Sequence, residues 1–463
     1  SQPVTWSVRT TFLVITSNPD GSRMSPVTKS ATVASVVSSG SGICTGSVES
    51  PQAARRTANT TVAAFQFLYD IDSASFAWVR VARMRGIIAD FAAYARSLTG
   101  AARAPATLPP SPRIRMSDPE SQQPGRYAVI LAGGIGSRFW PASTPIRPKQ
   151  LLPLGGERPL ILETVDRARR LVGKDRVRIL TGHGLVDPFR RAVPDLEEDE
   201  FLVEPIARST GPALVWAAQE IETMEPGALM ISLHSDHVIQ PFEEFENTID
   251  RACRAATERH GLVCLGIEPA RPETGYGYIE TGENLGEGVS SVLRFHEKPD
   301  AATAAEYASS GRFLWNSGIF VWRARDLLEE AANHAHEMKT AFPQLQLGDL
   351  EAYFRTVEPV SVDVGVLERS DRVEVARASF AWDDVGTWSA LDRTRRADEH
   401  GNVVVGDASI LEGSGNVVWA EDGPVRLFGV DDLVVVRASD EVLVMPKSKA
   451  ADLKRFITYL ETP

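Results

Sequence analysis

The sequence predicts an α/β protein that carries a small β-rich domain at its C-terminal end. Between residues 127 and 267, short β-rich runs alternate with segments of helical period, as in a mixed, mostly parallel sheet covered by helices on both faces. The expected strands are 127–132, 177–181, 201–203, 229–233 and 262–267. After about residue 400 the pattern changes to short β runs separated by Gly, Asp and Asn turns, followed by a closing helix.

Helix starts support this prediction. Expected helices cover 159–171 and 212–223, and a third follows Pro241; each begins at or near a proline, whose fixed φ suits the first helical turn. The expected strands of the last domain are 403–405, 417–419, 425–428, 433–436 and 442–445, and its helix covers 450–460. We therefore expect one α/β domain over residues 116–395 and one β-rich domain over residues 396–463.

Composition is that of an ordinary globular protein. Hydrophobic residues make up 43% of the 463 residues and charged residues 24%. No apolar run approaches the roughly 20 residues that a membrane helix needs, so no membrane partner is expected. The three cysteines are too widely spaced for a disulfide framework or a zinc site. This pattern favours a reducing, cytoplasmic location.

The net charge of −12 is unevenly distributed. Residues 1–115 hold 12 basic and 5 acidic residues, whereas the remainder holds 37 basic and 56 acidic ones. An acidic body argues against nonspecific binding of nucleic acid, which needs a positive face. Any anionic substrate must instead meet local positive charges.

Residues 1–115 differ from the rest of the chain, being rich in Ser, Thr, Ala, Val and Arg. Three interpretations remain open: a disordered extension, an organelle transit peptide, or a segment that is not natural coding sequence. The third is favoured, because Met116 opens a short polar lead to the first strong strand. It predicts a natural start at Met116.

A glycine-rich loop directly follows the first strong strand, at the strand end where parallel sheets bind ligands. Its glycines, Gly133, Gly134 and Gly136, let backbone N–H groups approach phosphate oxygens closely. Arg138 adds a bidentate donor and Lys149 a second cation for the same polyphosphate. A plain glycine turn with solvated basic residues is the alternative. The segment matches neither a Walker loop nor a dinucleotide fingerprint.

A carboxylate stands at the end of another expected strand, in the run His234-Ser-Asp236-His237. Asp236 is well placed to hold Mg²⁺, a hard ion that prefers oxygen ligands. The two histidines raise a transition-metal site as the rival. We expect these side chains not to converge, because neighbours on a strand point to opposite faces.

Several motifs together give a specific resemblance. Leu131-Ala-Gly-Gly-x-Gly-x-Arg138 with Trp140-Pro141 and Arg147-Pro-Lys149-Gln150 resembles the signature of sugar-1-phosphate nucleotidyltransferases, and of the mannose-1-phosphate guanylyltransferases in particular. Further similar segments are Glu204-Pro-x-x-Arg208, Thr274 to Tyr278, Glu297-Lys298-Pro299, Trp315 to Phe320 and Trp382 to Trp388. The resemblance runs from about residue 127 to the C-terminus. It implies a Rossmann-like catalytic domain and a β-helix-like C-terminal domain.

The resemblance also implies roles for individual residues. The catalytic set is Arg138, Lys149, Asp236 and Lys298; the metal ligands for Mg²⁺ are Asp236 and Asp384; and Asp383, at a variable position, has no role. Nucleotide contacts are expected from Leu131, Ala132, Gly133, Gly134, Gly136, Glu204, Arg208 and Thr210, and sugar contacts from Gly277, Glu297 and Asn316. Ser209 and Gly211 depart from the usual Asn and Ala of the family, and Ser209 or Thr210 is expected to cap the following helix.

The implied activity is transfer of GMP from GTP to mannose 1-phosphate, which yields GDP-mannose and pyrophosphate. GTP, mannose 1-phosphate and Mg²⁺ are thus the expected partners, and a homodimer is left open. Two alternatives remain: a nucleotidyltransferase that uses glucose 1-phosphate with UTP, ATP or dTTP, and a non-catalytic subunit that senses sugar nucleotides. A sensor has no need to keep Arg138, Lys149, Asp236 and Asp384 together.

Overall fold

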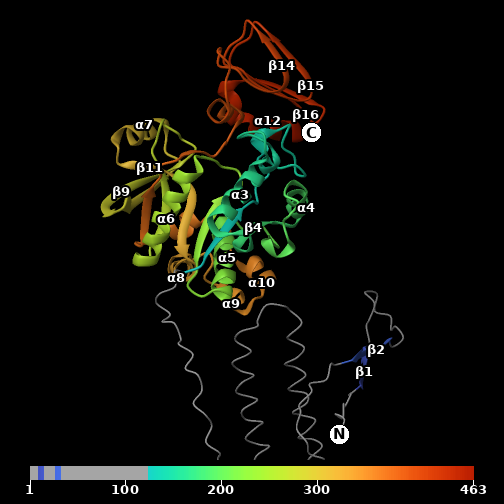
Figure 1. Ribbon diagram of the computed structural model, residues 1–463, viewed down its shortest axis with the longest axis vertical. Helices are drawn as coiled ribbons and strands as arrows, with labels where there is room; N and C mark the ends of the chain where they lie inside the picture. Colours follow the sequence, from blue (N-terminus) through green and yellow to red (C-terminus); the bar gives the residue numbers. More distant parts are fainter. Residues whose placement is uncertain (1–8, 15–26, 33–123, 463) are drawn as a thin grey trace, which may run out of the picture. The chain divides into compact units, whose positions relative to one another are not determined.

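A computed structural model describes residues 9–14, 27–32 and 124–462 of the chain (Figure 1). The chain divides into two units, 1–114 and 115–463, and each is described by itself. In the first unit, β1 (Arg9–Val14) and β2 (Val27–Thr32) form an antiparallel pair. The rest of residues 1–115 lies outside the described residues. The interpretations of that segment, including a start at Met116, therefore stay predictions.

The centre of the second unit is a nine-stranded sheet in the order β5-β4-β3-β6-β11-β8-β12-β10-β9. Strands β5, β4, β3 and β6 are parallel, as are β8 and β12, whereas β9, β10 and β11 pair antiparallel with their neighbours. The bounds are β3 Arg126–Leu131, β4 Val177–Gly182, β5 Phe201–Glu204, β6 Leu229–His234, β8 Leu262–Ile267, β9 Gly277–Gly286, β10 Val289–Glu297, β11 Phe313–Arg323 and β12 Val373–Arg377.

The predicted α/β fold with a mixed sheet is confirmed, and all five expected strands are present. Antiparallel pairing is more extensive than expected. The reason is local: β9 and β10 form a hairpin closed by the turn at Gly286 and Gly288, and β11 inserts between β6 and β8. No helical segment separates β9 from β10 in the way that a parallel crossover requires.

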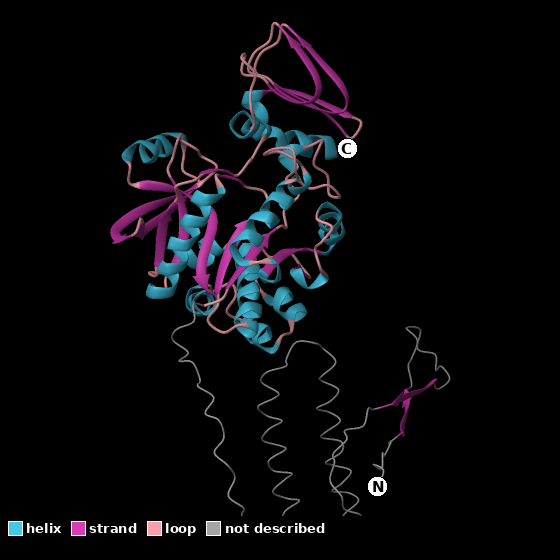
Figure 2. Cartoon of the chain, viewed as in Figure 1, coloured by secondary structure: helices cyan, strands magenta, loops and turns pink. Residues whose placement is uncertain are grey.

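Helices cover both faces of the sheet (Figure 2). One face packs against α3 (Leu160–Val172), α4 (His183–Ala192) and α6 (Phe242–Arg259), and the other against α5 (Thr210–Met224), α8 (Ala324–His334) and α10 (Leu350–Thr356). Strand β3 shows why: Ala128 and Ile130 face the first group, and Tyr127 and Val129 the second, all buried. The smaller helices are α7 Ala301–Ser310, α9 Phe342–Leu347 and α11 Leu391–Thr394.

The predicted cap of α5 is wrong. The residue before the helix, Ser209, has φ 69° and makes no side-chain capping bond. The hydroxyl of Thr210 instead accepts a hydrogen bond from the backbone N–H of Val362, at 3.0 Å. A cap needs extended backbone at its own residue, which the left-handed φ of Ser209 does not provide.

The C-terminal sheet contains β14 (Val403–Leu411), β15 (Val417–Phe428), β16 (Leu433–Ala438) and β17 (Glu441–Pro446) in that order. The first three are parallel, as in a β-helix, and β17 closes the sheet antiparallel. The two runs predicted at 417–419 and 425–428 belong to the single strand β15. Helix α12 (Leu453–Glu461) follows a 3₁₀ turn at Lys447–Asp452.

This domain shares part of its core with the α/β domain. Trp419 of β15 is buried in the same cluster as Phe139, next to the glycine-rich loop, and Trp388, shortly after Asp384. Among the helices of the described residues, none combines the length and apolar character that crossing a membrane demands.

Candidate active site

The glycine-rich loop after β3 is open at its tip. Gly133 and Gly134 are exposed, and a Cβ on either would meet no atom within 4 Å. Gly136 has φ 71°, and a Cβ there would lie 2.3 Å from the Cβ of Lys149. Only glycine satisfies both conditions at position 136. Glycine at position 136 therefore lets the backbone of the loop pack directly against the Cβ of Lys149.

The other predicted residues of this segment differ in how freely they can contact a ligand. Leu131 and Ala132 are buried, and their backbone groups bond Ser235, Leu180 and Thr181 within the protein. Their contacts with a ligand are limited to packing. Arg138 is exposed and takes part in no ion pair with any residue from 124 to 462. Its guanidinium is free to meet an anion.

Lys149 joins the two predicted metal ligands. Its Nζ donates to Oδ2 of Asp236 at 2.7 Å and to the backbone oxygen of Asp384 at 2.6 Å. The lysine is only 5% exposed. Although burial works in the opposite direction, the adjacent ammonium lowers the pKa of Asp236 well below its usual range. Asp236 and Asp384 lie 87 and 235 positions from Lys149 in the sequence, yet the three residues form one cluster.

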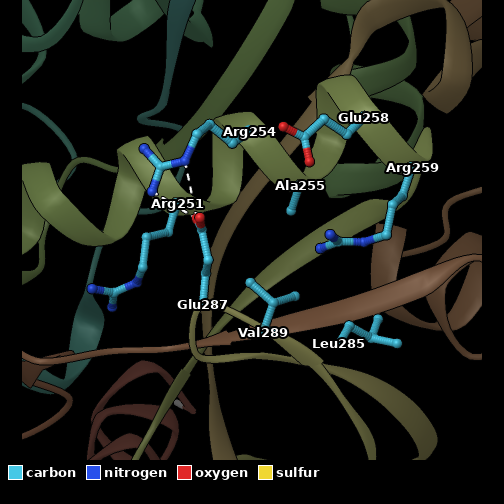
Figure 3. A pocket seen from close by; sticks show the side chains of 9 residues that line it. Arg251, Arg254, Ala255, Glu258, Arg259, Leu285, Glu287 and Val289 are labelled. Carbon is cyan, nitrogen blue, oxygen red and sulfur yellow. Dashed lines mark hydrogen bonds and ion pairs between the residues drawn. The ribbon is translucent and has the colours of Figure 1, made fainter.

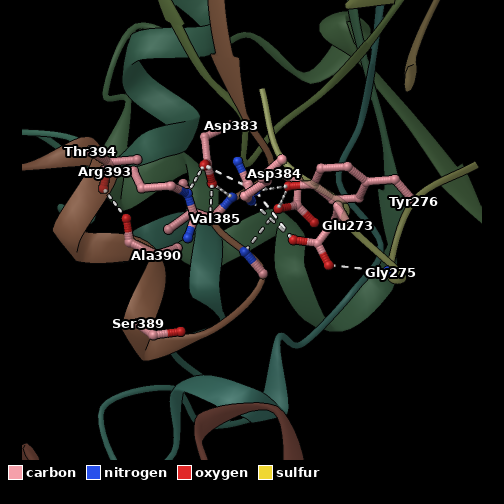
Figure 4. A network of polar contacts seen from close by, with 12 residues as sticks. Glu273, Gly275, Tyr276, Asp383, Asp384, Val385, Ser389, Ala390, Arg393 and Thr394 are labelled. Carbon is pink, nitrogen blue, oxygen red and sulfur yellow. Dashed lines mark hydrogen bonds and ion pairs between the residues drawn. The ribbon is translucent and has the colours of Figure 1, made fainter. Parts of the chain in front are cut away.

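The carboxylate of Asp384 belongs to a wider polar network (Figure 4). Its Oδ1 accepts from the hydroxyl of Tyr276 at 2.6 Å and from the N–H of Gly386 at 3.1 Å. Burial raises the pKa of Asp384, and burial with the nearby Asp384 charge raises that of Tyr276. Tyr276 therefore stays a hydrogen-bond donor at neutral pH.

Asp383, which received no role, has a structural one. Its oxygens accept from Nε of Arg393 at 2.6 Å and from the N–H of Val385 at 2.8 Å. Asp383 is 7% exposed, so Arg393 and the N–H of Val385 satisfy an acceptor that is otherwise buried. It holds the turn that carries Asp384.

The expectation that His234, Asp236 and His237 diverge is wrong. Ligand atoms of all three lie within 4.8 Å of one another, and the two imidazoles stack at 4.7 Å. The physical reason is that β6 ends at His234, so Asp236 and His237 lie in the following turn rather than on a strand.

A different observation argues against a transition metal at these three residues. Nδ1 of His237 accepts a hydrogen bond from Nε1 of Trp382 at 3.1 Å. Indole nitrogen can only donate, so neutral His237 carries its proton on Nε2 and offers no lone pair there. Burial lowers the pKa of His237, so the ring is in the neutral form that this hydrogen bond requires. His237 supports Trp382 rather than a metal.

The three predicted sugar residues converge. Gly277 and Glu297 are direct partners in the β9–β10 ladder. A Cβ on Gly277 would lie 2.9 Å from Oε2 of Glu297 and 3.5 Å from the Cβ of Asn316. Lys298 has φ 45° and forms an ion pair with Glu297. Glycine at 277 leaves open the space between the carboxylate and the amide.

The sugar cluster lies next to the carboxylate cluster. Tyr276, bonded to Asp384, directly precedes Gly277. On the other side, a Cβ on Gly318 would lie 2.7 Å from Nε2 of His234, two residues before Asp236. A ligand could therefore contact the Lys149 cluster with one end and the Gly277 cluster with the other.

The predicted nucleotide residues after β5 bond other parts of the protein. Nε of Arg208 donates to the backbone oxygen of Phe354 at 2.8 Å, and Thr210 accepts from Val362. Burial raises the pKa of Glu204 to about 7. The segment is thus fixed to residues 354–362, and Glu204 is half-protonated near neutral pH.

Two polar residues of the site escaped sequence reasoning. Tyr276 lies inside the segment singled out for Gly277, but nothing in the sequence indicated that its hydroxyl reaches Asp384. Asp363 accepts from Nδ2 of Asn316 at 2.7 Å and has no sequence signal, because 47 residues separate the pair. Only the tertiary structure reveals these contacts.

A cavity of about 220 Å³ lies elsewhere, between α6 and the β9–β10 turn (Figure 3). It is lined by Arg251, Arg254, Arg259, Glu258 and Glu287, among others. Arg254 pairs with Glu287, and Arg259 with Glu374, so most of its charge is already neutralised. None of the predicted site residues lines it. The Lys149 and Gly277 clusters remain the candidate active site, because the predicted site residues come together there.

The donor set at the Lys149 cluster fits a hard divalent ion. In residues 124–462, Oδ1 of Asp236 and Oδ2 of Asp384 accept no hydrogen bond from another residue. Two carboxylate oxygens of this kind suit an ion that also binds phosphate.

Comparison with known proteins agrees with this geometry. Residues 127–401 match the family model described as nucleotidyl transferase, and residues 402–460 match the MannoseP isomerase/GMP-like beta-helix domain. The mannose-1-phosphate guanylyltransferase of Salmonella muenchen is 36% identical over 349 residues, covering 72% of this chain and 73% of that protein. The alginate biosynthesis protein AlgA of Pseudomonas putida is 35% identical over 346 residues, covering 72% and 71%.

A solved structure, of a mannose-1-phosphate geranyltransferase from Thermus thermophilus, has a TM-score of 0.67 and 34% identity, covering 73% of this chain and 99% of that one. Enzymes of the matched family generally use a divalent metal with a nucleoside triphosphate and a sugar 1-phosphate. The chain belongs to the nucleotidyl transferase family, with a beta-helix domain of the MannoseP isomerase/GMP-like type after the catalytic domain.

Proposed function

We propose that the protein transfers GMP from GTP to mannose 1-phosphate. A phosphate oxygen of mannose 1-phosphate attacks the α-phosphorus of GTP in line; the new O–P bond forms as the bond to the β-phosphate oxygen breaks, and pyrophosphate leaves. The observation that carries the proposal is the adjacency of two clusters, Lys149 with Asp236 and Asp384, and Gly277 with Glu297 and Asn316. The relatives named as mannose-1-phosphate guanylyltransferases support the same activity.

The chemistry requires two anions to meet, so catalysis consists of positioning and charge stabilisation. In this proposal the N–H groups of Gly133, Gly134 and Gly136 face the triphosphate, while Arg138 and Lys149 hold the leaving pyrophosphate. Lys298 orients the attacking phosphate after its ion pair with Glu297 is replaced by a contact with that phosphate. Mg²⁺ held by Asp236 and Asp384 would supply further neutralisation of the α-phosphate.

Binding of the two substrates is assigned to separate sides. Glu297 accepts from sugar hydroxyls, the amide of Asn316 contacts the sugar, and Gly277 lets the ring approach the backbone. The nucleotide side consists of Leu131 and Ala132 by packing, with Glu204, Arg208 and Thr210 near the base. Support for the latter group is the position of its segment at the start of α5, beside the parallel strands.

A matrix of four nucleoside triphosphates against several sugar 1-phosphates, read by pyrophosphate release, tests the proposal. We expect the highest kcat/KM for GTP with mannose 1-phosphate and strict dependence on a divalent ion. Preference for UTP, ATP or dTTP with glucose 1-phosphate would contradict the proposed substrates, while the protein would still be a sugar-1-phosphate nucleotidyltransferase. Binding of GDP-mannose without turnover of any pair would instead favour a sugar-nucleotide sensor.

The proposal includes a cytoplasmic location and leaves a homodimer as its assembly to be tested. Two cysteines among the described residues, Cys253 and Cys264, are free and buried, in line with a reducing compartment. Cell fractionation tests the location. Sedimentation velocity at several concentrations tests the dimer, which a single monomeric species would contradict.

A further inference from the structure

The turn that carries Asp363, residues 360–363 leading into the short π-helix Asp363–Leu367, lies between the two sides of the active site. On the sugar side, Nδ2 of Asn316 donates to Oδ1 of Asp363 at 2.7 Å. On the nucleotide side, the N–H of Val362 donates to the hydroxyl of Thr210 at 3.0 Å. The turn also accepts a bond from the N–H of Gly211 to the oxygen of Val360, at 3.0 Å. One short segment thus contacts both substrate sides.

Asn316 has its orientation set from both ends of its amide. Its Oδ1 accepts from the N–H of Gly318 at 3.0 Å, within an irregular part of β11 where Gly318 has φ 70°. Its Nδ2 meets Asp363, which is the one side-chain acceptor that the amide nitrogen has in residues 124–462. Without Asp363, only the bulge at Gly318 would fix the rotation of the amide about its last torsion.

The nucleotide-side contact is close enough to favour glycine at position 211. A Cβ at Gly211 would lie 2.7 Å from the backbone oxygen of Val360. A backbone atom cannot yield as a flexible side chain can, so glycine permits this close approach. The turn at 360–363 therefore sits closer to the start of α5 than an alanine would allow.

Fold stability alone does not require a carboxylate at Asp363. Burial raises its pKa, although the hydrogen bond from Asn316 works in the opposite direction. A partly buried acid is costly to the fold, so stability gives no reason to prefer it to an apolar residue here. A function at the site is the better reason for its presence.

We infer that Asp363 is a positioning residue for the sugar: it holds the amide of Asn316 against the Gly277 and Glu297 cluster, from a turn anchored to the nucleotide side by Thr210 and Gly211. The inference rests on the proposed function, since it takes Asn316 as a sugar contact. Asp363 acts through Asn316 and not on the reacting phosphates. It should therefore affect the sugar and leave the nucleotide almost unchanged.

Calorimetric binding of GDP-mannose and of GDP to the full chain separates these contributions, because the two ligands differ only in the sugar. In Asp363→Leu, which lacks an acceptor at similar size, we expect the Kd of GDP-mannose to rise about tenfold, as for loss of a buried hydrogen-bond partner. The Kd of GDP should change by less than about twofold. Partial misfolding would lower the binding stoichiometry without altering either Kd.

Two further variants make the test specific. Asp363→Asn keeps an oxygen that can accept from Asn316, so its Kd for GDP-mannose should rise no more than about threefold. Val364→Ala, at an exposed neighbour in the same turn, is the matched control and should bind both ligands as the wild type does.

The inference is overturned if Asp363→Leu binds GDP-mannose normally, if Asp363→Asn is as impaired as Asp363→Leu, or if GDP weakens as much as GDP-mannose. The proposed function fails by a different result, in which the wild-type protein binds GDP-mannose no better than GDP and turns over no substrate pair.

Discussion

The ammonium of Lys149 lies 2.7 Å from Oδ2 of Asp236 and bonds the backbone oxygen of Asp384, so a single cation bridges the two residues proposed to bind the metal. In the protein without a bound metal, the ammonium of Lys149 neutralises the carboxylate charge of Asp236 that a metal ion would otherwise neutralise. The pKa of Asp236 is lowered by this neighbour, which keeps the carboxylate ionised and ready for an ion.

The first prediction concerns Lys149 itself. Lys149→Met removes a cation that competes for Asp236, so the substrate-free protein should bind Mn²⁺ more tightly than the wild type. Turnover should nevertheless fall by about 10²–10³, because the leaving pyrophosphate loses a charge partner. Electron paramagnetic resonance titration of Mn²⁺ and steady-state kinetics measure the two effects. Weaker Mn²⁺ binding in the variant would show that Lys149 is not a competitor.

The second prediction concerns the two carboxylates. Asp236→Asn or Asp384→Asn should each lower kcat by about 10²–10³ at saturating Mg²⁺, since a strong electrostatic contact is lost at nearly constant shape. Asp187→Asn, at an exposed helix position, is the matched control. Asp383→Asn should mainly lower the Tm, because it weakens the charge-assisted hydrogen bond between the buried Asp383 and Arg393. Near-normal activity in both Asp236→Asn and Asp384→Asn would place the metal elsewhere.

Repeated local patterns made much of this structure predictable. The strand before the glycine-rich loop, the helices that begin near proline and the parallel pairing of β3, β4 and β5 follow from periodicity over short stretches. The same reasoning failed where tertiary contacts decide. Nothing local indicates that β11 inserts between β6 and β8. The expected strand 229–233 ends before Asp236 and His237, as β6 does at His234, so the error was to treat these residues as strand neighbours.

The residues of the candidate site also divide into those that a local motif indicated and those that only tertiary contacts reveal. The residues themselves singled out Lys149 and Asp236, and the resemblance to the nucleotidyltransferases added Asp384, but neither indicated that the lysine contacts both aspartates. Tyr276 and Asp363 were missed because their partners lie 108 and 47 residues away. Hydrogen bonds over such separations leave no periodic trace in one sequence.

The third prediction concerns pH. Burial raises the pKa of Glu204 from 4.5 to about 7 in the folded chain. A raised pKa means that the folded state holds the proton more tightly, so this contribution to stability is complete below about pH 4.5 and is lost as pH rises through 7. Glu204→Gln has no such loss. Its Tm minus that of the wild type should therefore increase from about pH 5 to about pH 8.5 in differential scanning calorimetry, and a constant difference would contradict the shift.

The fourth prediction concerns backbone strain at Ser209, whose φ of 69° and ψ of −178° fall in a region that favours glycine. Ser209→Gly should stabilise the protein by about 1 kcal/mol, because the side chain makes no capping bond that would be lost. Ser309→Gly, inside helix α7, is the control and should destabilise. Urea unfolding measures both, and a lower midpoint for Ser209→Gly would show that its backbone is not strained.

The last prediction concerns the C-terminal domain as a support of the active site. The ring of Trp419 lies 5.4 Å from that of Trp388, which in turn lies 5.0 Å from Phe139 beside the glycine-rich loop. Nε1 of Trp388 also donates to the backbone oxygen of Trp140 at 3.2 Å. These contacts connect strand β15 to the glycine-rich loop and to the turn that carries Asp384.

Trp419→Ala should therefore destabilise the protein by about 3–5 kcal/mol, as expected for a buried tryptophan, and should also raise the KM for GTP. The ion pair between Arg147 and Glu421, at 2.5 Å, crosses the same junction but is partly exposed, so Glu421→Gln should cost less than about 1 kcal/mol. Phe428→Ala, on the same strand but 68% exposed, is the matched control and should change neither quantity appreciably. Thermal unfolding and GTP kinetics below the Tm separate the two effects. If Trp419→Ala lowered the Tm but kept the wild-type KM for GTP, the β-helix domain would stabilise the fold without positioning the glycine-rich loop.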